Sequence, residues 1–215
     1  MNLPEDVQKN FPSAFYSCKK ITSFCLKSTI IDSIGRHAFC ECKKLKKVVI
    51  STTNNLTIGE KCFAFCEQLN VIDIKCDSSV LEDFCFECCK SLPKLDFNVK
   101  TISFGQNYIS GCEQLKSICI PDADDINIQE KSFISLSQFQ SIHFKTKKFK
   151  ISLNSFENCP VSEIRFENCP VSEKLLNDGG LSFLASFDSL KQLDLISHSK
   201  LTIKNSLLQN LNALN

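Results

Sequence analysis

The chain has 215 residues, of which 43% are hydrophobic, enough to bury the core of one domain or of one continuous repeat array. Its 25 basic and 24 acidic residues give a net charge of +1, which excludes a global electrostatic attraction to nucleic acid or to anionic membrane. No apolar run approaches the roughly 18 residues of a membrane span, and the N-terminal stretch lacks the basic and apolar regions of a secretory signal. The sequence therefore predicts a cytoplasmic protein without direct membrane insertion.

The cysteine content is unusual, with 14 residues in the chain. Such a count is typical of a disulfide framework in a small secreted protein, but this chain is neither small nor visibly secreted. The spacing of the cysteines needs another explanation, and an internal repeat supplies one.

The repeat begins with "AFYSCKKITSFCL" at residues 14–26 and returns as "AFCECKKLKKVVI" at residues 38–50. The second residue of each copy recurs in steps of 23 or 24 along the chain: Phe15, Phe39, Phe63, Phe86, Ile109 and Phe133. A copy with one residue missing, "SFENCPVSEIRF", follows at 155–166, and Leu184 and Leu208 take the same slot in two weaker copies. A fixed period in the twenties predicts a solenoid.

Each repeat combines two kinds of spacing. Phe39, Cys42 and Leu45 lie three residues apart, which predicts one face of a short helical turn, whereas the alternation of Val48 and Ile50 is typical of a strand. Glycine occupies the slot just ahead of the helical turn in only some repeats, so a positive φ is not obligatory there. One repeat cannot close a core, and stacked neighbours therefore bury it together.

The pattern A-F-x-x-C-x-x-L-x-x-I-x-I, with I-G just upstream, resembles the BspA-like subclass of leucine-rich repeats. The resemblance covers roughly residues 10–214. It implies an α/β leucine-rich-repeat solenoid of about nine coils, a single domain over residues 1–215, with a parallel β-sheet on the concave face and short helical turns on the other side. It also implies an adhesion or protein-binding surface without catalytic residues, and it favours the cell surface as an alternative to the cytoplasm.

Two segments depart from the regular pattern. Segment 166–180 breaks the phase, because "FENCPVSE" occurs at 156–163 and again at 166–173 before "KLLNDGG", so we expect a loop or a short helical excursion there. The sequence stops at "LQNLNALN", after the helical half of a repeat and without an obviously polar cap. Self-association through this open C-terminal end makes a structural, self-associating array the alternative function.

One column of cysteines is predicted to have a packing role. The slot of Cys42 is filled in other repeats by Cys18, Cys66, Cys89, Cys112 and Cys159, but also by Leu136, Phe187 and Leu211. A slot that accepts Leu and Phe is hydrophobic, and cysteine there behaves as a small buried apolar residue. Coils about 5 Å apart are close enough for disulfides. The missing signal and the Leu and Phe substitutes argue for free thiols.

Two further patterns suggest a metal site or a nucleic-acid patch. Cys85 and Cys88 have C-x-x-C spacing, but a zinc knuckle needs a second pair, and the cysteines at 40 and 42 lie two coils and roughly 10 Å away. The lysines of "KKLKK" align in the next coil with Glu67, Gln68, Asn70 and Val71, so no basic stripe continues. We therefore expect no cofactor, no metal and no nucleic-acid partner.

The residues between the inward strand positions point outward, so core packing does not dictate their identity. Their mixed charge favours a protein or peptide partner over a phosphate backbone. The predicted partner-binding residues on the concave face are Asp73, Lys75, Lys94, Asp96, Cys119, His143, Lys145 and Arg165.

A rival interpretation concerns three of these residues. Asp96, Cys119 and His143 fall on consecutive predicted strands about 5 Å apart, which permits a Cys nucleophile beside a His base or a partial metal site. The sequence supplies no oxyanion hole and no walled pocket. We therefore interpret the protein as a non-enzymatic binding scaffold, with a Cys/His metal-binding or nucleophilic site as a remote alternative.

Overall fold

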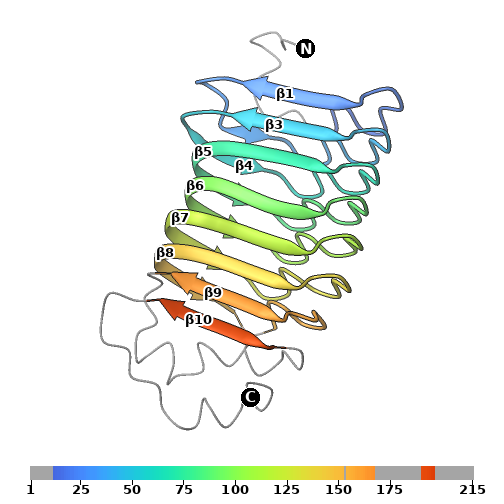
Figure 1. The fold of residues 1–215 in the computed structure, drawn as a ribbon. Coiled ribbons are helices and arrows are strands. Elements are labelled where there is room, and N and C mark those ends of the chain that lie inside the picture. Colours follow the sequence, from blue (N-terminus) through green and yellow to red (C-terminus); the bar gives the residue numbers. More distant parts are fainter. Residues whose placement is uncertain (1–11, 153, 168–189, 197–215) are drawn as a thin grey trace.

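The chain winds as a solenoid of stacked parallel strands (Figure 1). The computed structural model describes residues 12–152, 154–167 and 190–196. The strands that follow one another across the sheet are β1 (Ser23–Lys27), β3 (Lys47–Ser51), β5 (Val71–Leu81), β6 (Lys94–Phe104), β7 (Ser117–Ile128), β8 (Ser141–Ile151), β9 (Glu163–Glu167) and β10 (Gln192–Ile196). They pair in parallel because each coil returns the chain to the same side before the next strand begins.

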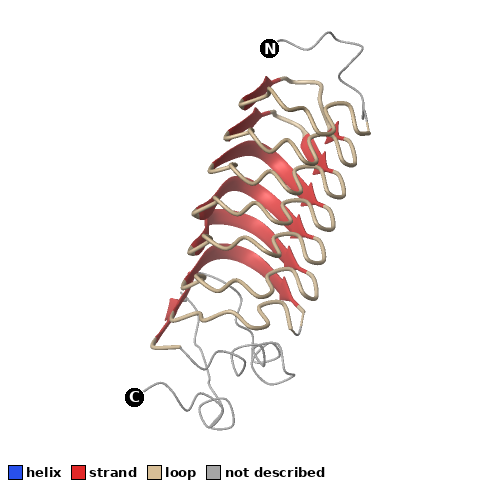
Figure 2. Ribbon diagram, turned by 90° about the vertical axis from the view of Figure 1, so that its right-hand side faces the viewer, coloured by secondary structure: helices blue, strands red, loops and turns tan. Residues whose placement is uncertain are grey.

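In the coils from β1 to β8, the chain continues in strand conformation past a bend. In the first two repeats the second part is a separate strand, β2 (Ser33–Ile34) or β4 (Asn55–Ile58), and β4 pairs with the second half of β5. In β5 to β8 one strand of 11 or 12 residues runs through both parts. Figure 2 shows these longer strands bowed, so that the sheet wraps partly around the core.

The register of the sheet follows the period of the sequence. Val49 lies opposite Asp73, and Cys119 lies opposite His143, each pair 24 residues apart. Seven strands, β1, β3, β5, β6, β7, β8 and β9, are joined by six full turns of the chain, which confirms the predicted solenoid with a parallel sheet. The predicted number of about nine coils is not confirmed.

Part of the prediction falls on residues whose structure is not described. These include the weaker repeats around Leu184 and Leu208, the C-terminal end from residue 197 and most of the out-of-phase segment 166–180. The first two residues of that segment, Phe166 and Glu167, belong to β9 and are regular.

The predicted helical turns are not confirmed, and neither is the α/β class, because the described residues contain strands and turns but no helix. The amide of Cys42 bonds to the carbonyl of Phe39 in its own turn, whereas the amide of Phe39 bonds to the carbonyl of Cys62 in the next coil. An α-helix would direct all these amides to its own carbonyls. The turns instead use every second amide to join neighbouring coils.

Positive φ angles explain why no helix forms. Two residues in each described turn, four apart, have left-handed backbones: Ser13 and Ser17, His37 and Glu41, Lys61 and Phe65, Phe84 and Cys88, Asn107 and Gly111, Lys131 and Ser135, Asn154 and Asn158. A left-handed residue cannot continue a right-handed helix. The three-residue spacing of the apolar positions therefore reflects a succession of i to i+3 turns.

The glycine slot ahead of the turn has a different cause. The one glycine with a positive φ in the described part of the chain is Gly111, which lies within a turn. A Cβ added at Gly59 would lie 2.6 Å from the backbone nitrogen of Arg36 in the preceding coil. Close approach of two coils, not a special φ, thus favours glycine at this slot.

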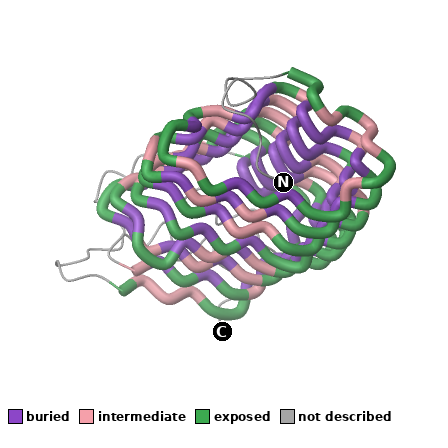
Figure 3. The backbone as a smooth tube through the Cα atoms, turned by 90° about the horizontal axis from the view of Figure 1, so that it is seen from above, coloured by how far each residue is buried: buried purple, intermediate pink, exposed green. Residues whose placement is uncertain are grey.

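A column of aromatic rings forms the centre of the core. The rings of Phe39, Phe63 and Phe86 stack with 5.3 Å between successive centroids and interplanar angles of 10° and 6°. Tyr108 meets Phe86 edge-on, and Phe133 meets Tyr108 in the same way. Figure 3 shows the buried residues along the inner side of the coils and the exposed residues outside. Each coil therefore closes its core only against its neighbours.

The cysteine column packs beside these rings, and every described cysteine has a free thiol. Its sulfur atoms also make a contact that the sequence interpretation missed. The Sγ atoms of Cys42, Cys66, Cys89, Cys112 and Cys159 donate to the carbonyls of Phe15, Phe39, Phe63, Phe86 and Phe133 in the preceding coil, over 3.1 to 3.4 Å. The slot thus holds an apolar atom that also bridges adjacent coils.

In the described part of the chain, no helix is long and apolar enough to cross a membrane.

Candidate functional site

The sheet face is defined here as the outward-pointing side chains of β1, β3, β9, β10 and the first halves of β5 to β8. Exposed and buried residues alternate along β6 and β9, which turns Asp96 and Arg165 outward and Leu95 and Ile164 inward. All the predicted partner-binding residues have at least part of their surface open to solvent on this face: Asp73, Lys75, Lys94, Asp96, Cys119, His143, Lys145 and Arg165.

The central column of the sheet face runs across five consecutive strands, β6 to β10. Asp96 lies opposite Cys119, Cys119 opposite His143, His143 opposite Arg165, and Arg165 opposite Asp194. Because the register is parallel and in phase, residues far apart in the sequence form one continuous row.

Ion pairs within strands neutralise much of the charge on the sheet face. Lys75 pairs with Asp73 at 3.6 Å, and Lys94 pairs with Asp96. The side chains involved are 45% to 64% exposed, so water screens these pairs and each adds little to stability. They leave alternating charge of both signs available to a partner.

Lys145 pairs across strands with Asp122 at 3.4 Å. Asp122 follows Pro121 at the bend of β7 and was missed as a site residue, because the register of β7 against β8 shifts between Ile120 and Ala123. Such an irregularity is not visible in a strict alignment of repeats.

A polar cluster of four residues lies across β7, β8 and β9. The Sγ of Cys119 is 3.5 Å from Nδ1 of His143, and Nε2 of the same ring is 3.2 Å from Oε1 of Glu167. Arg165 donates from Nε to that carboxylate oxygen. The expected proximity of Cys119 and His143 is therefore confirmed, and Glu167 is an additional member.

The pKa values of two residues in this cluster are shifted in opposite directions. Burial and the nearby carboxylate of Asp96 raise the pKa of the Cys119 thiol. The hydrogen bond from Arg165, helped by His143, lowers the pKa of Glu167. Nε2 of His143 is covered and has no well-aligned hydrogen bond, although it lies 3.2 Å from the carboxylate of Glu167. Glu167 is thus held as an anion beside the imidazole.

A depression of about 220 Å³ adjoins the cluster at the last strands of the sheet. Its walls come from β8, β9 and β10 and consist of Ser141, Ile142, His143, Glu163, Ile164, Arg165, Gln192 and Asp194. It is too shallow and open to enclose a small substrate, but it can receive a side chain from a partner.

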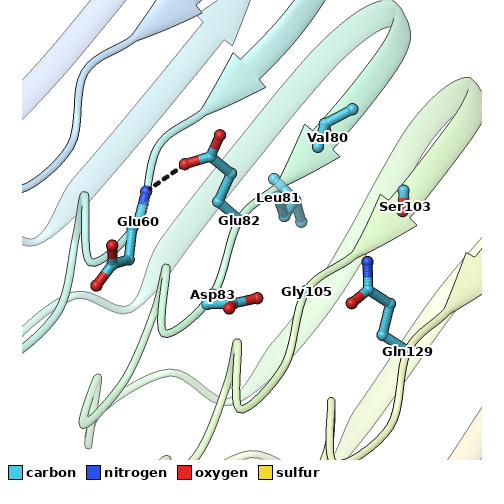
Figure 4. Close-up of a pocket in the computed structure, with 8 residues that line it drawn as sticks. All are labelled: Glu60, Val80, Leu81, Glu82, Asp83, Ser103, Gly105 and Gln129. Carbon is cyan, nitrogen blue, oxygen red and sulfur yellow. Dashed lines mark hydrogen bonds between the residues drawn. The ribbon is translucent and has the colours of Figure 1, made fainter.

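A second depression of about 210 Å³ lies away from the sheet face, where β5 and β6 end (Figure 4). Its acidic residues have structural partners: Glu82 accepts the backbone N–H of Glu60, and Asp83 accepts that of Gln106. The carboxylates therefore replace backbone acceptors where adjacent coils meet. This explains the acidic character of the depression without a ligand.

Metal binding has little geometric support. Within residues 12–152, 154–167 and 190–196, no group of three or more His, Cys, Asp or Glu side chains could hold a metal ion. Cys85 of the C-x-x-C motif is fully buried, and Cys88 lies in a turn with a φ of 56°. Lys43 of the basic cluster pairs with Glu67 of the next coil at 3.2 Å, as expected for a solvated surface.

The buried thiols are poor nucleophiles. Burial raises the pKa of Cys42 and Cys159 to about 11 and that of Cys66 further still. Because the thiolate is the reactive form, these cysteines are inert at neutral pH in the folded chain.

The repeats match the sequence model of BspA type leucine rich repeat regions in six copies, over residues 1–82 and 56–175. Among solved structures, the chain is similar to a leucine-rich repeat protein of T. pallidum, with a TM-score of 0.57 and 16% identity over 92% of this chain and 100% of that one. That likeness concerns the fold alone. No curated protein matches the sequence.

Two more solved structures are similar at lower TM-scores. A leucine-rich cell surface protein of Faecalibacterium prausnitzii gives a TM-score of 0.35 at 17% identity, over 94% of this chain and 68% of that one. A leucine-rich repeat protein of Bacteroides ovatus gives 0.30 at 17% identity, over 90% and 73%.

Proposed function

Because the chain belongs to the family of BspA type leucine rich repeat regions, we propose that it is a non-enzymatic scaffold that binds a protein or peptide on its sheet face. The observation that carries this proposal is the continuous outward row across β6 to β10. Its side chains are all at least partly open to solvent, and Asp96 and Arg165 are exposed. A rigid solenoid can therefore present them to a partner without an ordering cost.

Mixed charge defines the kind of partner. On the sheet face Asp73 and Asp96 are acidic, Arg165 is basic, and Asp194 is acidic again. A phosphate backbone requires a stripe of one sign, whereas a protein surface can match an alternating pattern. We therefore favour a protein or peptide over nucleic acid, with an adhesion role as the specific form that family membership suggests.

The centre of the interface is expected at Asp73, Asp96, Cys119, His143 and Arg165. Central residues are surrounded by other contacts, which exclude water and strengthen each interaction. Residues at the margin of the sheet stay hydrated and contribute less.

The test is a double charge reversal, Asp96→Lys with Arg165→Glu, in a pull-down from native lysate of the source cells. Capture of the partner seen with the original chain is expected to be lost. The melting curve should hardly move, because exposed substitutions usually change stability by no more than about 0.5 kcal/mol. Unchanged capture by the folded double variant would place binding away from the sheet face.

A matched control reverses the charges of an ion pair that lies outside the sheet face. Lys147 and Asp124 form an exposed ion pair at 2.7 Å on the second halves of β8 and β7. The double substitution Lys147→Asp with Asp124→Lys changes as many charges but leaves the sheet face intact. It should keep full capture.

The structural alternative is an array that assembles with itself. Light scattering over a range of concentrations separates the two functions. A strict monomer argues against assembly, whereas growth of the mass with concentration, unaffected by the sheet-face variant, supports it.

We propose a cytoplasmic location, with the cell surface as the alternative. The proposal is supported by the buried thiols, which bond to backbone carbonyls and do not form bridges. Alkylation of protein taken from its source under denaturing conditions would count the free thiols. A majority of bridged cysteines would favour the oxidising cell surface.

A further inference from the structure

Cys119 differs in its surroundings from the cysteines of the core. The core thiols donate to backbone carbonyls and are buried, as Cys66 is. Cys119 lies half-buried on the sheet face with its sulfur 3.5 Å from an imidazole nitrogen of His143. A thiol beside an imidazole, with a third group behind the imidazole, is the arrangement that activates a cysteine for attack.

The charges behind the imidazole favour proton transfer from the thiol. Arg165 keeps Glu167 ionised, and Glu167 lies against the far nitrogen of His143. When His143 accepts the thiol proton, the charges along the cluster alternate: thiolate, imidazolium, carboxylate, guanidinium. The covered Nε2 of the imidazolium then lies 3.2 Å from the anionic carboxylate of Glu167, which stabilises its charge.

Other groups oppose ionisation of the Cys119 thiol before a disulfide arrives. Asp96 faces Cys119 from β6, and together with burial it raises the pKa of the thiol, while Lys94 beside it acts in the opposite direction. The thiol is therefore mainly protonated at neutral pH, and its proton must leave as the new bond forms. A base in contact with the sulfur has its largest effect in this situation.

We propose that Cys119 is a thiol–disulfide exchange site for low-molecular-weight disulfides, with His143 as its base and Glu167 as the residue that positions that base. The sulfur of Cys119 attacks one sulfur of the incoming disulfide while its proton passes to Nδ1 of His143. The disulfide bond of the reagent breaks, and its leaving thiolate takes the proton from His143. Cys119 is oxidised to a mixed disulfide, and the leaving half is reduced to a thiol.

Cys119 is only partly buried, unlike the cysteines of the core. Ser117 and Ser141, two residues from Cys119 and His143 along their strands, lie opposite each other and have short side chains. Ser141 also lines the depression at β8 to β10. A small disulfide can therefore reach the sulfur from this side, which the buried cysteines do not permit.

The experiment measures the rate at which individual cysteines of the full chain form mixed disulfides with dithiodipyridine at neutral pH, resolved by peptide mass. Cys25 is the internal control, because it occupies the same column of the sheet face and is more exposed, but faces Val49 instead of an imidazole. Cys119 is expected to react at least about tenfold faster than Cys25. Equal or slower reaction of Cys119 would overturn the proposal.

Two variants test the roles of the neighbours. His143→Gln should lower the rate at Cys119 to that of Cys25 or below, and Glu167→Gln should lower it in part and shift its pH profile. Persistent protection of the core cysteines shows that each variant is folded. An unchanged rate in folded His143→Gln contradicts the proposal.

The pH profile of the original chain gives a second readout that needs no variant. Base assistance by His143 predicts a rate at Cys119 that levels off below the thiol pKa. Asp96, Lys94, Glu167 and Arg165 surround the pair, and the shifted pKa values of Lys94 and Glu167 keep these two groups charged across the range of interest. A rate that rises tenfold per pH unit without a plateau would show an unassisted thiol.

Discussion

The thiol of Cys66 donates a hydrogen bond over 3.2 Å to the carbonyl oxygen of Phe39 in the preceding coil. The same carbonyl accepts the amide of Cys42 from its own turn. Cys66 therefore fills space in the core and joins two coils with one atom. Leucine, which takes this slot at position 136, can do only the first.

Replacement of Cys66 by alanine removes the sulfur and its bond together. We expect a loss on the order of 2 kcal/mol, because a small buried cavity adds to the loss of a weak hydrogen bond. Urea unfolding followed by circular dichroism measures it. Cys66→Ser, whose hydroxyl can reach the same carbonyl, is the matched control, and equal stability of the alanine variant and the original chain would contradict a bridging role.

Phe63 is the second test of the stack. Its ring lies between those of Phe39 and Phe86 and is fully buried. Phe63→Ala should cost roughly 3 to 5 kcal/mol, since it leaves a cavity open to both neighbours. Thermal unfolding measures the loss, and a cost below about 1 kcal/mol would mean that the column collapses around the gap.

Replacement of a left-handed turn residue by glycine should stabilise the folded chain. Lys131 is exposed and has a φ of 56°, which costs a residue with a Cβ roughly 1 kcal/mol or more. Lys131→Gly should therefore raise the free energy of unfolding by up to about 1 kcal/mol, as measured by chemical denaturation.

Gly111 supplies the opposite control. Its φ is +70°, and an added Cβ would lie 2.9 Å from the sulfur of Cys88. Gly111→Ala should destabilise the chain. Changes of the same sign in both variants would argue against backbone conformation as the cause.

Alkaline pH should unfold the chain through its buried thiols. The folded chain holds the pKa of Cys42, Cys76 and Cys159 at about 11, against about 8.5 for an unfolded cysteine. Between these values the unfolded chain loses thiol protons that the folded chain keeps, so the free energy of unfolding falls as the pH rises. Below about pH 8.5 this contribution is fully present.

Thermal melts at intervals from pH 8 to pH 11 measure the effect. A double variant, Cys42→Ala with Cys159→Ala, should show a shallower decline of the melting temperature over the same range. Identical slopes for both proteins would assign the decline to lysine and tyrosine side chains.

The strand columns could be predicted because two simple periods determine them. A repeat of 23 or 24 residues sets which residues are neighbours, and the alternation of a strand sets which of them point outward. Asp96, Cys119 and His143 thus fell opposite one another as expected. The turns could not be predicted in the same way, because an i to i+3 spacing serves a helix and a series of turns equally.

The role of Glu167 shows another limit. It lies in a flanking column, so an alignment of repeats places it beside Lys145 but not against the ring of His143. Its contact depends on the diagonal reach of side chains across two strands. The bond from Cys66 to Phe39 likewise depends on the separation of adjacent coils, which the sequence does not state.

The hydrogen bonds between successive turns also give one edge of the solenoid a net dipole. The amides of Ser13, Phe39 and Phe63 all point to carbonyls of the following coil, toward the C-terminal end. Peptide dipoles in these rows add up as they do in an α-helix, but with the opposite sense relative to the chain. At this edge, the carbonyl ends of the first described turn favour a cation, whereas the N terminus of a helix favours an anion.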